Sequence, residues 1–283
     1  MSKRDIEKTA VITGAASGIG RAYALALAKR GFKVGIVDID MEGAKETLEM
    51  VERSGGSGEV FSCNVRRLEE VQKTADHFFE KWGKVGILVN NAGVADVGMV
   101  GDIKIEDWER QIETNLWGYI YGCHSFIPRM KEQGGGHIVN TASSAGMVTL
   151  RSMGPYNVTK AGVIALSETL KTELAPFNIG VTVVCPSFLR TKLLDTTTTT
   201  DKWIFDLAEI SMEGARVTSD GLAEMVVKAV EKNRLYVFPQ PFAKITWIDK
   251  RIAPETFYRL FAFLNKKGWD EPLLKALGKH GMV

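Results

Sequence analysis

The chain is poor in the residues that hold metals or disulfides, and it lacks long apolar runs. Its three cysteines, Cys63, Cys123 and Cys185, are far apart and odd in number, which predicts reduced and mostly buried thiols. The four histidines are scattered without the spacing of metal ligands, so we expect no metal site. No stretch of about 18 uninterrupted apolar residues exists, which argues against a membrane-spanning helix.

An excess of charge of one sign is also missing. The 283 residues include 36 Lys and Arg against 34 Asp and Glu, a net charge of +2, and no basic run stands out. This balance gives no support for nucleic-acid binding. The first eight residues, MSKRDIEK, lack the apolar core of a signal peptide, so we expect a cytoplasmic protein.

What the sequence does contain is an alternation of short β-rich runs and longer helical patterns. This order predicts an α/β fold with a doubly wound, Rossmann-type parallel sheet and helices on both faces. The expected strands are 9–13, 33–37, 60–63, 87–89, 137–141, 181–184 and 235–238. The expected helices include 21–30, one ending at Trp82, 105–131 and one from Tyr156 to about Pro176. Ligands of such folds bind at the carboxyl ends of the strands.

A glycine-rich segment, TGAASGIG at residues 13–20, lies between the first expected strand and the first expected helix. Glycines let the backbone pass close to a pyrophosphate, and the N-terminus of a helix offers free N–H groups. The segment therefore predicts a dinucleotide site, with a plain tight turn as the alternative. The residues expected to contact the cofactor here are Gly14, Ser17, Gly18 and Ile19.

Asp38 ends the second expected strand, about 20 residues further along the chain. A carboxylate at this place can accept hydrogen bonds from both adenosine ribose hydroxyls, and it repels a 2′-phosphate. No Lys or Arg follows directly in residues 39–41, and Ser17 rather than a basic residue precedes Gly18. The pattern favours NAD over NADP. The alternative role for Asp38 is to cap the next helix.

Tyr156 and Lys160 are four residues apart, so they share one face of the expected helix. A phenol loses its proton near pH 10, and a cation within about 4–6 Å favours the phenolate by roughly 1–3 pKa units. Such a shift would let Tyr156 act as an acid or base near neutral pH. On its own, a pair with this spacing is more often a surface contact of little energetic value.

Taken together, these motifs resemble those of the short-chain dehydrogenase/reductase family, over about residues 6–240. The resemblance rests on several motifs in order along the chain: the 13–20 loop, Asn90-Asn-Ala-Gly93, Asn115, Ser143, Tyr156-x-x-x-Lys160 and the segment 185–191.

The resemblance implies a catalytic group of four residues. Tyr156 would be the general acid/base on the substrate oxygen, and Ser143 would hydrogen-bond and position that oxygen. Lys160 would lower the pKa of Tyr156 and bind the nicotinamide ribose. Asn115 would hold a water that links Lys160 to solvent. Ser143 is preferred to its neighbour Ser144 because it lies three residues before a glycine, as in the family pattern.

The resemblance also implies a set of cofactor-binding residues. Besides the glycine loop and Asp38, these are Asn64, Val65, Asn91, Ala92, Gly93, Tyr156, Lys160, Pro186, Leu189 and Thr191. Asn91 and Gly93 would line the adenosine side, while Leu189 and Thr191 would hold the nicotinamide carboxamide. The hydride chemistry itself would belong to the cofactor.

Three features depart from the family pattern. Asn64 stands where the family usually has Asp, although its amide can still hydrogen-bond adenine. Ser187 replaces the usual glycine after Pro186, which adds a side chain beside the nicotinamide. The C-terminal tail lacks the family's common glycine-rich ending, which puts the usual tetramer contact in doubt.

The residues expected near the reacting carbon are mostly apolar, and no Arg or Lys is placed among them to clamp a carboxylate or phosphate. They include Ala95, Met147, Val148, Met153 and Phe188. We therefore expect an NAD-dependent enzyme that acts on a small hydrophobic secondary alcohol or its ketone. The alternatives are an NADPH-dependent carbonyl reductase and, in a different class, a non-catalytic NAD-binding sensor or scaffold.

We expect one Rossmann-type catalytic domain over residues 1–240 and an aromatic-rich C-terminal extension over 241–283 packed on the same domain. Residues 187–220 follow a strand end and are interpreted as a substrate lid, with a simple surface loop as the alternative. The extension is interpreted as core packing or a dimer contact. Its alternatives are a wall of the substrate pocket and a weak interfacial membrane contact through an amphipathic helix around 254–267.

The resemblance further implies a homodimer or homotetramer. The helices 105–131 and 156–176 would pair with their copies about a two-fold axis. The first of these helices has more apolar surface than one buried face needs, supplied by Trp117, Tyr119, Tyr121 and Phe126.

Overall fold

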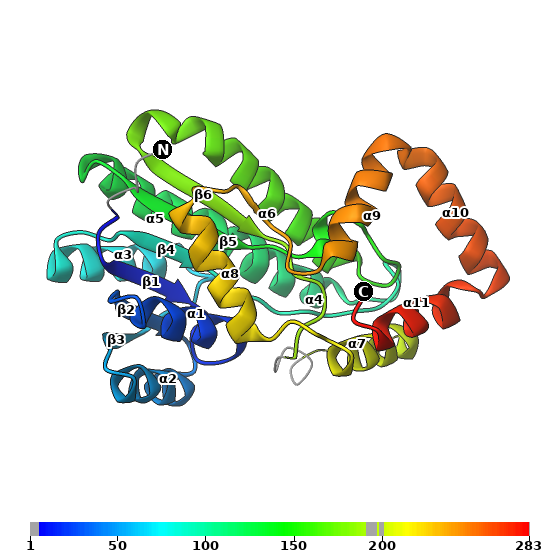
Figure 1. The fold of residues 1–283 in the computed structure, drawn as a ribbon, viewed down its shortest axis with the longest axis horizontal. Helices are drawn as coiled ribbons and strands as arrows, with labels where there is room; N and C mark the ends of the chain where they lie inside the picture. The colour runs from blue at the N-terminus through cyan, green and yellow to red at the C-terminus, as the bar shows by residue number, and fades with distance from the viewer. Residues whose placement is uncertain (1–5, 191–196, 198–200, 283) are drawn as a thin grey trace.

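The computed structural model describes residues 6–190, 197 and 201–282 (Figure 1). Its centre is a seven-stranded parallel sheet with the strand order β3-β2-β1-β4-β5-β6-β7. The strands are β1 (Thr9–Thr13), β2 (Lys33–Asp38), β3 (Ser57–Ser62), β4 (Ile87–Asn90), β5 (Gly136–Thr141), β6 (Ile179–Val184) and β7 (Tyr236–Val237). The predicted doubly wound fold is confirmed.

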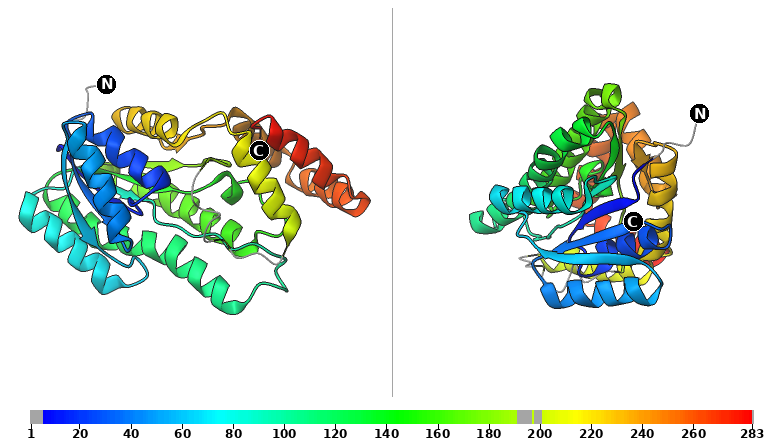
Figure 2. Two further views of the ribbon diagram at one scale, coloured as in Figure 1. Left: turned by 90° about the horizontal axis from the view of Figure 1, so that it is seen from below. Right: turned by 90° about the vertical axis from the view of Figure 1, so that its left-hand side faces the viewer.

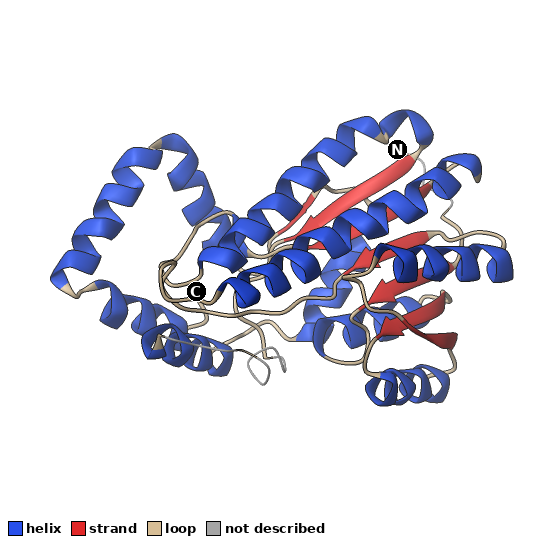
Figure 3. Cartoon of the chain, turned by 180° about the vertical axis from the view of Figure 1, so that it is seen from behind, coloured by secondary structure: helices blue, strands red, loops and turns tan. Residues whose placement is uncertain are grey.

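Helices cover both faces of the sheet, as the views from the front and from behind show (Figures 1 and 3). One face carries α1 (Gly18–Ala28), α2 (Met41–Arg53) and α8 (Ser219–Glu231). The other carries α3 (Leu68–Trp82), α5 (Gly118–Glu132) and α6 (Gly154–Glu173). Successive side chains of β1 point to opposite faces of the sheet and so pack with different helices. Ala10 and Ile12 pack in the cluster that contains Leu27 of α1, whereas Val11 packs with Phe78 of α3.

The strand order reverses at β1, which pairs with β2 on one side and β4 on the other. In sheets of this kind the crevice at such a reversal, outside the carboxyl ends of the strands, is the usual place for a ligand. The glycine-rich turn leaves β1 at this point, and Asn91 follows the end of β4. The topology therefore brings two of the predicted motifs to one edge.

The helix predicted over 105–131 is divided into three parts. They are α4 (Ile105–Ile112), a π-helical turn η1 (Glu113–Trp117) and α5. The wide turn contains Asn115, whose buried side chain is bound to the backbone of Val94. A π-helical turn inside a longer helix often occurs at a functional site.

The C-terminal part of the chain is helical. After α7 (Lys202–Glu213) and β7 come α9 (Pro241–Ile252), α10 (Pro254–Lys267) and α11 (Asp270–Lys279). Helix α10 extends away from the sheet, and α11 returns to lie beside α7 (Figures 1 and 2). Leu274 and Leu277 of α11 pack against Ile204 and Leu207 of α7. The extension is attached to the main body through α7 and through Trp247 of α9, which packs against Tyr236 of β7.

Within the described residues, no helix combines the length and the apolar character needed to cross a membrane. The same part of the chain holds no cluster of three or more His, Cys, Asp or Glu side chains that could bind a metal ion. All three cysteines are buried and unbridged.

Candidate active site

The glycine-rich turn is shaped by close backbone contacts. Gly14 has a φ of +65°, and a Cβ atom on it would lie 2.7 Å from the Cα atom of Ala92. A Cβ atom on Gly20 would lie 2.0 Å from the carbonyl oxygen of Gly14. The side-chain amide of Asn91 donates to the carbonyl groups of Thr13 and Gly14, at 3.1 Å each. These contacts fix the turn against the end of β4, and only glycine fits at the two positions.

The first turn of α1 is open to a ligand. The helix begins at Gly18, and the side chain of the N-cap residue Ser17 makes no capping hydrogen bond. No acidic residue lies in this first turn. Free N–H groups and the positive end of the helix dipole can therefore face an anion, as in other dinucleotide sites.

Asp38 is held in place at the end of β2. One carboxylate oxygen accepts a hydrogen bond from the N–H of Ala16 at 2.9 Å, and the other accepts from the N–H of Asp40 at 3.0 Å. The alternative role of Asp38 as a helix cap is wrong, because Asp40 is the N-cap of α2 and accepts from the N–H of Gly43. Asp38 thus presents a fixed negative charge to the crevice.

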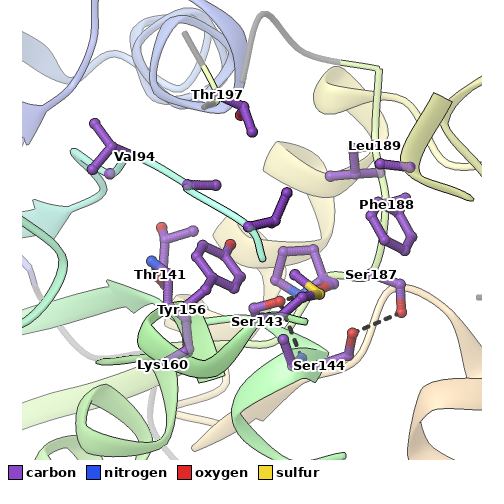
Figure 4. Close-up of a pocket in the computed structure, with 18 of the residues that line it drawn as sticks. Val94, Thr141, Ser143, Ser144, Tyr156, Lys160, Ser187, Phe188, Leu189 and Thr197 are labelled. Carbon is purple, nitrogen blue, oxygen red and sulfur yellow. Dashed lines mark hydrogen bonds between the residues drawn. The ribbon is translucent and has the colours of Figure 1, made fainter. Parts of the chain in front are cut away.

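The fold brings Ser143, Tyr156 and Lys160 together (Figure 4). Ser143 follows the end of β5, and the other two lie on the first turns of α6. Burial raises the pKa of Tyr156 above its ordinary value, and the neighbouring side chain of Ser143, whose hydroxyl donates to the Pro186 carbonyl at 3.3 Å, opposes this rise. Ser144 instead hydrogen-bonds Ser187 at 3.0 Å. The geometry therefore pairs Ser143, and not Ser144, with the tyrosine.

The buried ammonium of Lys160 has a partner that the sequence did not indicate. Its Nζ atom donates to the carbonyl oxygen of Thr141 at 2.9 Å, and the hydroxyl of Tyr119 donates to the same oxygen at 2.9 Å. Burial lowers the pKa of Lys160 to about 7, and it raises the pKa of Tyr119 well above its ordinary value. The Nζ atom lies 5.6 Å from the centre of the Tyr156 ring.

Lys160 was expected to lower the pKa of Tyr156, but it is not among the groups that shift this pKa in the structure. The dominant effect on the phenol is burial, which raises its pKa, and the opposing effect comes from the side chain of Ser143. Lys160 itself loses charge readily, because the same burial disfavours its ammonium form.

Asn115 does not line the cavity, although it lies just behind it. Its side-chain oxygen accepts from the N–H of Val94 at 2.9 Å, and its nitrogen donates to the Val94 carbonyl at 2.8 Å. The same nitrogen lies 3.4 Å from the hydroxyl of Thr159, next to Lys160 in the chain. Asn115 thus joins the η1 turn to the segment after β4 and to α6. Its role in holding a water remains a prediction.

One cavity of about 750 Å³ joins the expected cofactor and catalytic residues. Its lining includes Gly14, Ser17, Gly18, Ile19, Asp38, Asn64, Val65, Asn91, Ala92, Gly93, Ser143, Tyr156, Lys160, Pro186 and Leu189. Four of the five expected substrate-pocket residues also line it: Ala95, Val148, Met153 and Phe188. Met147 does not, because its side chain is buried with Val163 and Cys185 in a separate core cluster. Thr191 lies outside the described residues.

The sequence did not reveal that the C-terminal helices supply much of the remaining wall. These lining residues are Phe205 of α7, Phe242 of α9, Phe261 and Leu264 of α10, and Leu273 and Leu277 of α11. The high aromatic content of the tail was the available signal, and it was interpreted first as core packing or a dimer contact. The structure supports both core packing, through Leu274 and Trp247, and the alternative of a pocket wall.

A second correction concerns charge in the pocket. No Arg or Lys was expected among the substrate-pocket residues to clamp a carboxylate or phosphate, yet Arg110 lines the cavity. Its guanidinium is paired with the buried carboxylate of Asp96. The ion pair with Asp96 therefore compensates the positive charge of Arg110 in the cavity wall.

The comparison with known families decides the assignment. A family model described as short chain dehydrogenase matches residues 8–202, which is more than two thirds of the chain. The chain belongs to the short-chain dehydrogenase/reductase family. The resemblance seen in the motifs is confirmed, and the family to which the chain belongs consists of oxidoreductases that use nicotinamide cofactors.

Characterised relatives of this short-chain dehydrogenase differ in the polarity of their substrates. The chain is 37% identical over 186 residues to D-threitol dehydrogenase of Mycolicibacterium smegmatis, and the match covers 66% of this chain and 72% of the relative. It is 33% identical over 195 residues to cyclohexanol dehydrogenase of an Acinetobacter species, covering 69% of this chain and 78% of the relative. Threitol is a polyol, whereas cyclohexanol is mainly apolar.

Some curated relatives are much longer. The chain is 37% identical over 187 residues to the "Probable oxidoreductase EphD" of Mycobacterium tuberculosis, which covers 66% of this chain but spans only 32% of that protein. Among solved structures, a short-chain dehydrogenase/reductase from Burkholderia phymatum in complex with NAD superposes with a TM-score of 0.84 at 30% identity. The match covers 90% of this chain and 96% of that one.

Proposed function

We propose that this short-chain dehydrogenase transfers a hydride between NAD(H) and a hydrophobic secondary alcohol or its ketone. The observation that carries the proposal is the continuous cavity. It connects the open first turn of α1 and Asp38 at one end with Ser143 and Tyr156, and with an apolar wall, at the other.

The residues present fit a nicotinamide dinucleotide. The glycine-rich turn and the uncapped first turn of α1 line the cavity, where they could face a pyrophosphate, and Asp38 offers a fixed acceptor to the adenosine ribose. Asn64 and Val65 would border the adenine, and Lys160 the nicotinamide ribose. When bound, the cofactor would accept or donate the hydride. NAD is proposed over NADP because Asp38 would repel a 2′-phosphate, and the Burkholderia relative was solved with NAD.

Tyr156 would move the proton. In the oxidative direction its phenolate takes the proton from the substrate hydroxyl, and in reduction its phenol returns a proton to the new alkoxide oxygen. The side chain of Ser143 would hydrogen-bond the same oxygen and hold it beside the phenol. Because burial raises the pKa of Tyr156, oxidation should accelerate as the pH rises and more of the phenol ionises.

The substrate is proposed to be hydrophobic because aromatic and aliphatic side chains from α7, α9, α10 and α11 line the far side of the cavity. Arg110 is neutralised by Asp96 and offers no free charge to an anionic group. Activity on cyclohexanol in a relative supports this choice, whereas the threitol-specific relative is the main argument for a polar substrate.

A carbonyl reductase is the second candidate. The raised pKa of Tyr156 favours the protonated phenol, which is the form needed to reduce a ketone. An NADPH-dependent version is disfavoured by Asp38. A non-catalytic sensor is disfavoured because Asn115, Ser143, Tyr156 and Lys160 are all present. We also propose that residues 187–220, which include the cavity-lining helix α7, act as a substrate lid. We further propose that the C-terminal extension and the catalytic part form a single domain, and that the protein works in the cytoplasm.

The proposal is tested by following NADH absorbance with a panel of apolar, polyol and anionic alcohols. Turnover should be greatest with apolar secondary alcohols. The Tyr156→Phe variant should lose about 10³ in kcat while its NADH binding, read by fluorescence, is unchanged. Ser143→Ala should lose about 10² in kcat, and Ser144→Ala is the matched control that should lose little. Turnover of anionic alcohols or polyols alone would refute the substrate class.

A further inference from the structure

Helix α10 is exposed on its outer side, whereas Phe257, Tyr258, Phe261 and Leu264 are half-buried on its inner side. None of its 14 residues is buried, and in α9 only Ala243 is. Helix α10 stands away from the sheet (Figures 1 and 2), whereas α9 packs its Trp247 against Tyr236 of β7. Helices of this length are marginal in water on their own, and most helices in proteins are stabilised by packing one apolar face. Within the described residues, the outer sides of both helices have no covering element, and they are the sides that a partner surface could cover.

The exposed positions of these helices include large apolar side chains. Ile245, Ile248 and Ile252 follow the spacing of one helix face on α9, and Ile252 is 78% exposed. Leu260 and Phe263 are about half exposed on α10. Two more exposed apolar side chains, Trp269 and Leu273, lie at the start of α11. We call these seven residues, together with the exposed basic residues of α9 and α10, the tail surface.

The charge of the same segment is strongly positive. Residues 241–267 hold six Lys and Arg against two Asp and Glu, a net charge of +4, although the whole chain carries only +2. The remaining residues therefore carry a net charge of −2. The exposed cations include Lys244, Arg251, Lys266 and Lys267. Two copies of this positive surface would repel each other, whereas an anionic lipid surface would attract it.

The opposite side of the same helices faces the cavity. Phe261 and Leu264 of α10 line it, and so does Leu273, which is also exposed. An apolar and basic outer side thus continues into the apolar wall of the cavity. A ligand leaving a lipid surface at these helices would meet apolar side chains on its way in.

We propose that the tail surface binds the interface of an anionic membrane, with its apolar side chains among the lipids and its lysines at the headgroups. The cavity then opens beside the bilayer. This inference rests on the exposure and charge of α9 and α10, and it does not depend on the proposed reaction. Its consequence for function, which does rest on the proposed reaction, is that substrates dissolved in the bilayer reach the site.

The test is flotation of the full chain with two kinds of vesicle: phosphatidylcholine alone, and phosphatidylcholine with phosphatidylserine in equal amounts. We expect at least tenfold more protein to float with the anionic vesicles, and we expect salt to weaken the binding. The triple variant Lys244→Glu, Lys266→Glu, Lys267→Glu should lose this binding. Ile252→Asp with Phe263→Asp should lose it as well.

The matched control reverses three exposed lysines elsewhere, Lys73→Glu, Lys104→Glu and Lys232→Glu, and should still float. Circular dichroism and turnover of a water-soluble alcohol would show that the variants are folded. Turnover can fail for every alcohol while flotation succeeds, so the two proposals are tested separately.

Three results would overturn the membrane proposal. One is equal or absent binding to both kinds of vesicle. Another is an equal loss of binding in the control. The third is a protein dimer, measured without vesicles, that dissociates on Ile252→Asp, because a second copy of the chain would then cover the tail surface.

Discussion

Burial of the charged Lys160 side chain lowers the free energy of unfolding. Its side chain is only 3% exposed, and burial lowers its pKa to about 7. The unfolded chain would keep the ordinary value near 10.4. Between these two values the unfolded state binds a proton that the folded state has lost, so this residue makes stability rise with pH over that window. Below pH 7 Lys160 is protonated in both the folded and the unfolded state, so the folded state bears the full free-energy cost of burying the charge.

The Lys160→Met variant should therefore be more stable than the wild type, by roughly 2–5 kcal/mol at pH 6, with a gap that narrows toward pH 10. The Thr141 carbonyl would keep its hydrogen bond from Tyr119. Urea unfolding at pH 6 and pH 9 measures the effect. Lys73→Met, at an exposed position, is the control and should change little. A gap that widens with pH would contradict this account.

Asp38 should govern the choice of cofactor. Asp38→Asn removes the charge that repels a 2′-phosphate, so the ratio of kcat/KM for NAD over NADP should fall by about tenfold or more, equivalent to at least ~1.4 kcal/mol. The control is Asp40→Asn, two residues away, which can still cap α2. Steady-state kinetics with both cofactors measure the ratio. Equal effects of the two variants would mean that general charge, not the position of Asp38, sets the preference.

At the scale of elements, the buried strands were the most predictable part. All five residues of β1 are buried, and an apolar run ending at a glycine marks such a strand. The edge strand β3 begins at Ser57, earlier than expected, because Ser57-Gly-Glu59 carries no apolar signal. The π-helical turn could not be predicted, since it depends on a contact between Asn115 and Val94, 21 residues apart in the chain.

The helix expected around 254–267 matches α10, because Pro254 and Gly268 mark its two ends. The contribution of this helix to the cavity was not predictable from its own residues. It depends on how α11 returns to α7, and that packing is fixed by contacts distant in sequence.

One of these contacts is made by Arg151, in the loop before α6. Its guanidinium lies 3.8 Å from the centre of the Trp203 ring on α7, and its Nε atom donates to the carboxylate of Asp270 on α11 at 2.9 Å. The carboxylate of Asp270 is nearly buried at the edge of the cavity. Arg151 therefore joins α7 and α11 to the body of the protein.

The Arg151→Met variant should loosen this attachment and leave the carboxylate of Asp270 without its ion pair. We expect KM for the alcohol to rise about five- to tenfold, which is equivalent to ~1–1.4 kcal/mol and is less than the roughly 1.5–3 kcal/mol of a charged hydrogen bond because only part of that loss reaches the alcohol site. KM for NAD should stay the same. Arg259→Met, which removes an exposed pair with Glu255, is the control and should have little effect on either constant. A rise in both KM values would point to a general loss of folding.

At the scale of the whole molecule, the expected two-fold contact can be made more specific. Two of the four aromatics that suggested it, Tyr119 and Phe126, are buried within the chain. Trp117 is 45% exposed and stacks on Tyr121, and Val158 of α6 is 52% exposed. These positions are the ones left to form an interface.

We expect the protein to be at least a dimer at micromolar concentration in sedimentation velocity. The double variant Trp117→Glu, Val158→Glu should be monomeric, because it places unpaired charges of one sign in the centre of an apolar contact. Met50→Lys, on the exposed side of α2, is the control and should stay dimeric. A monomeric wild type would end this proposal.

The order of the chain divides the cavity into two parts. The expected cofactor residues lie between Gly14 and Thr191, whereas Phe205, Phe242, Phe261 and the α11 residues all come later. The family match ends at residue 202, close to this division. The cofactor-binding part of the cavity and the wall supplied by the tail therefore come from two separate stretches of the chain. A chimaera that joins residues 1–201 to the tail of another short-chain dehydrogenase would keep its cofactor and acquire a new range of alcohols.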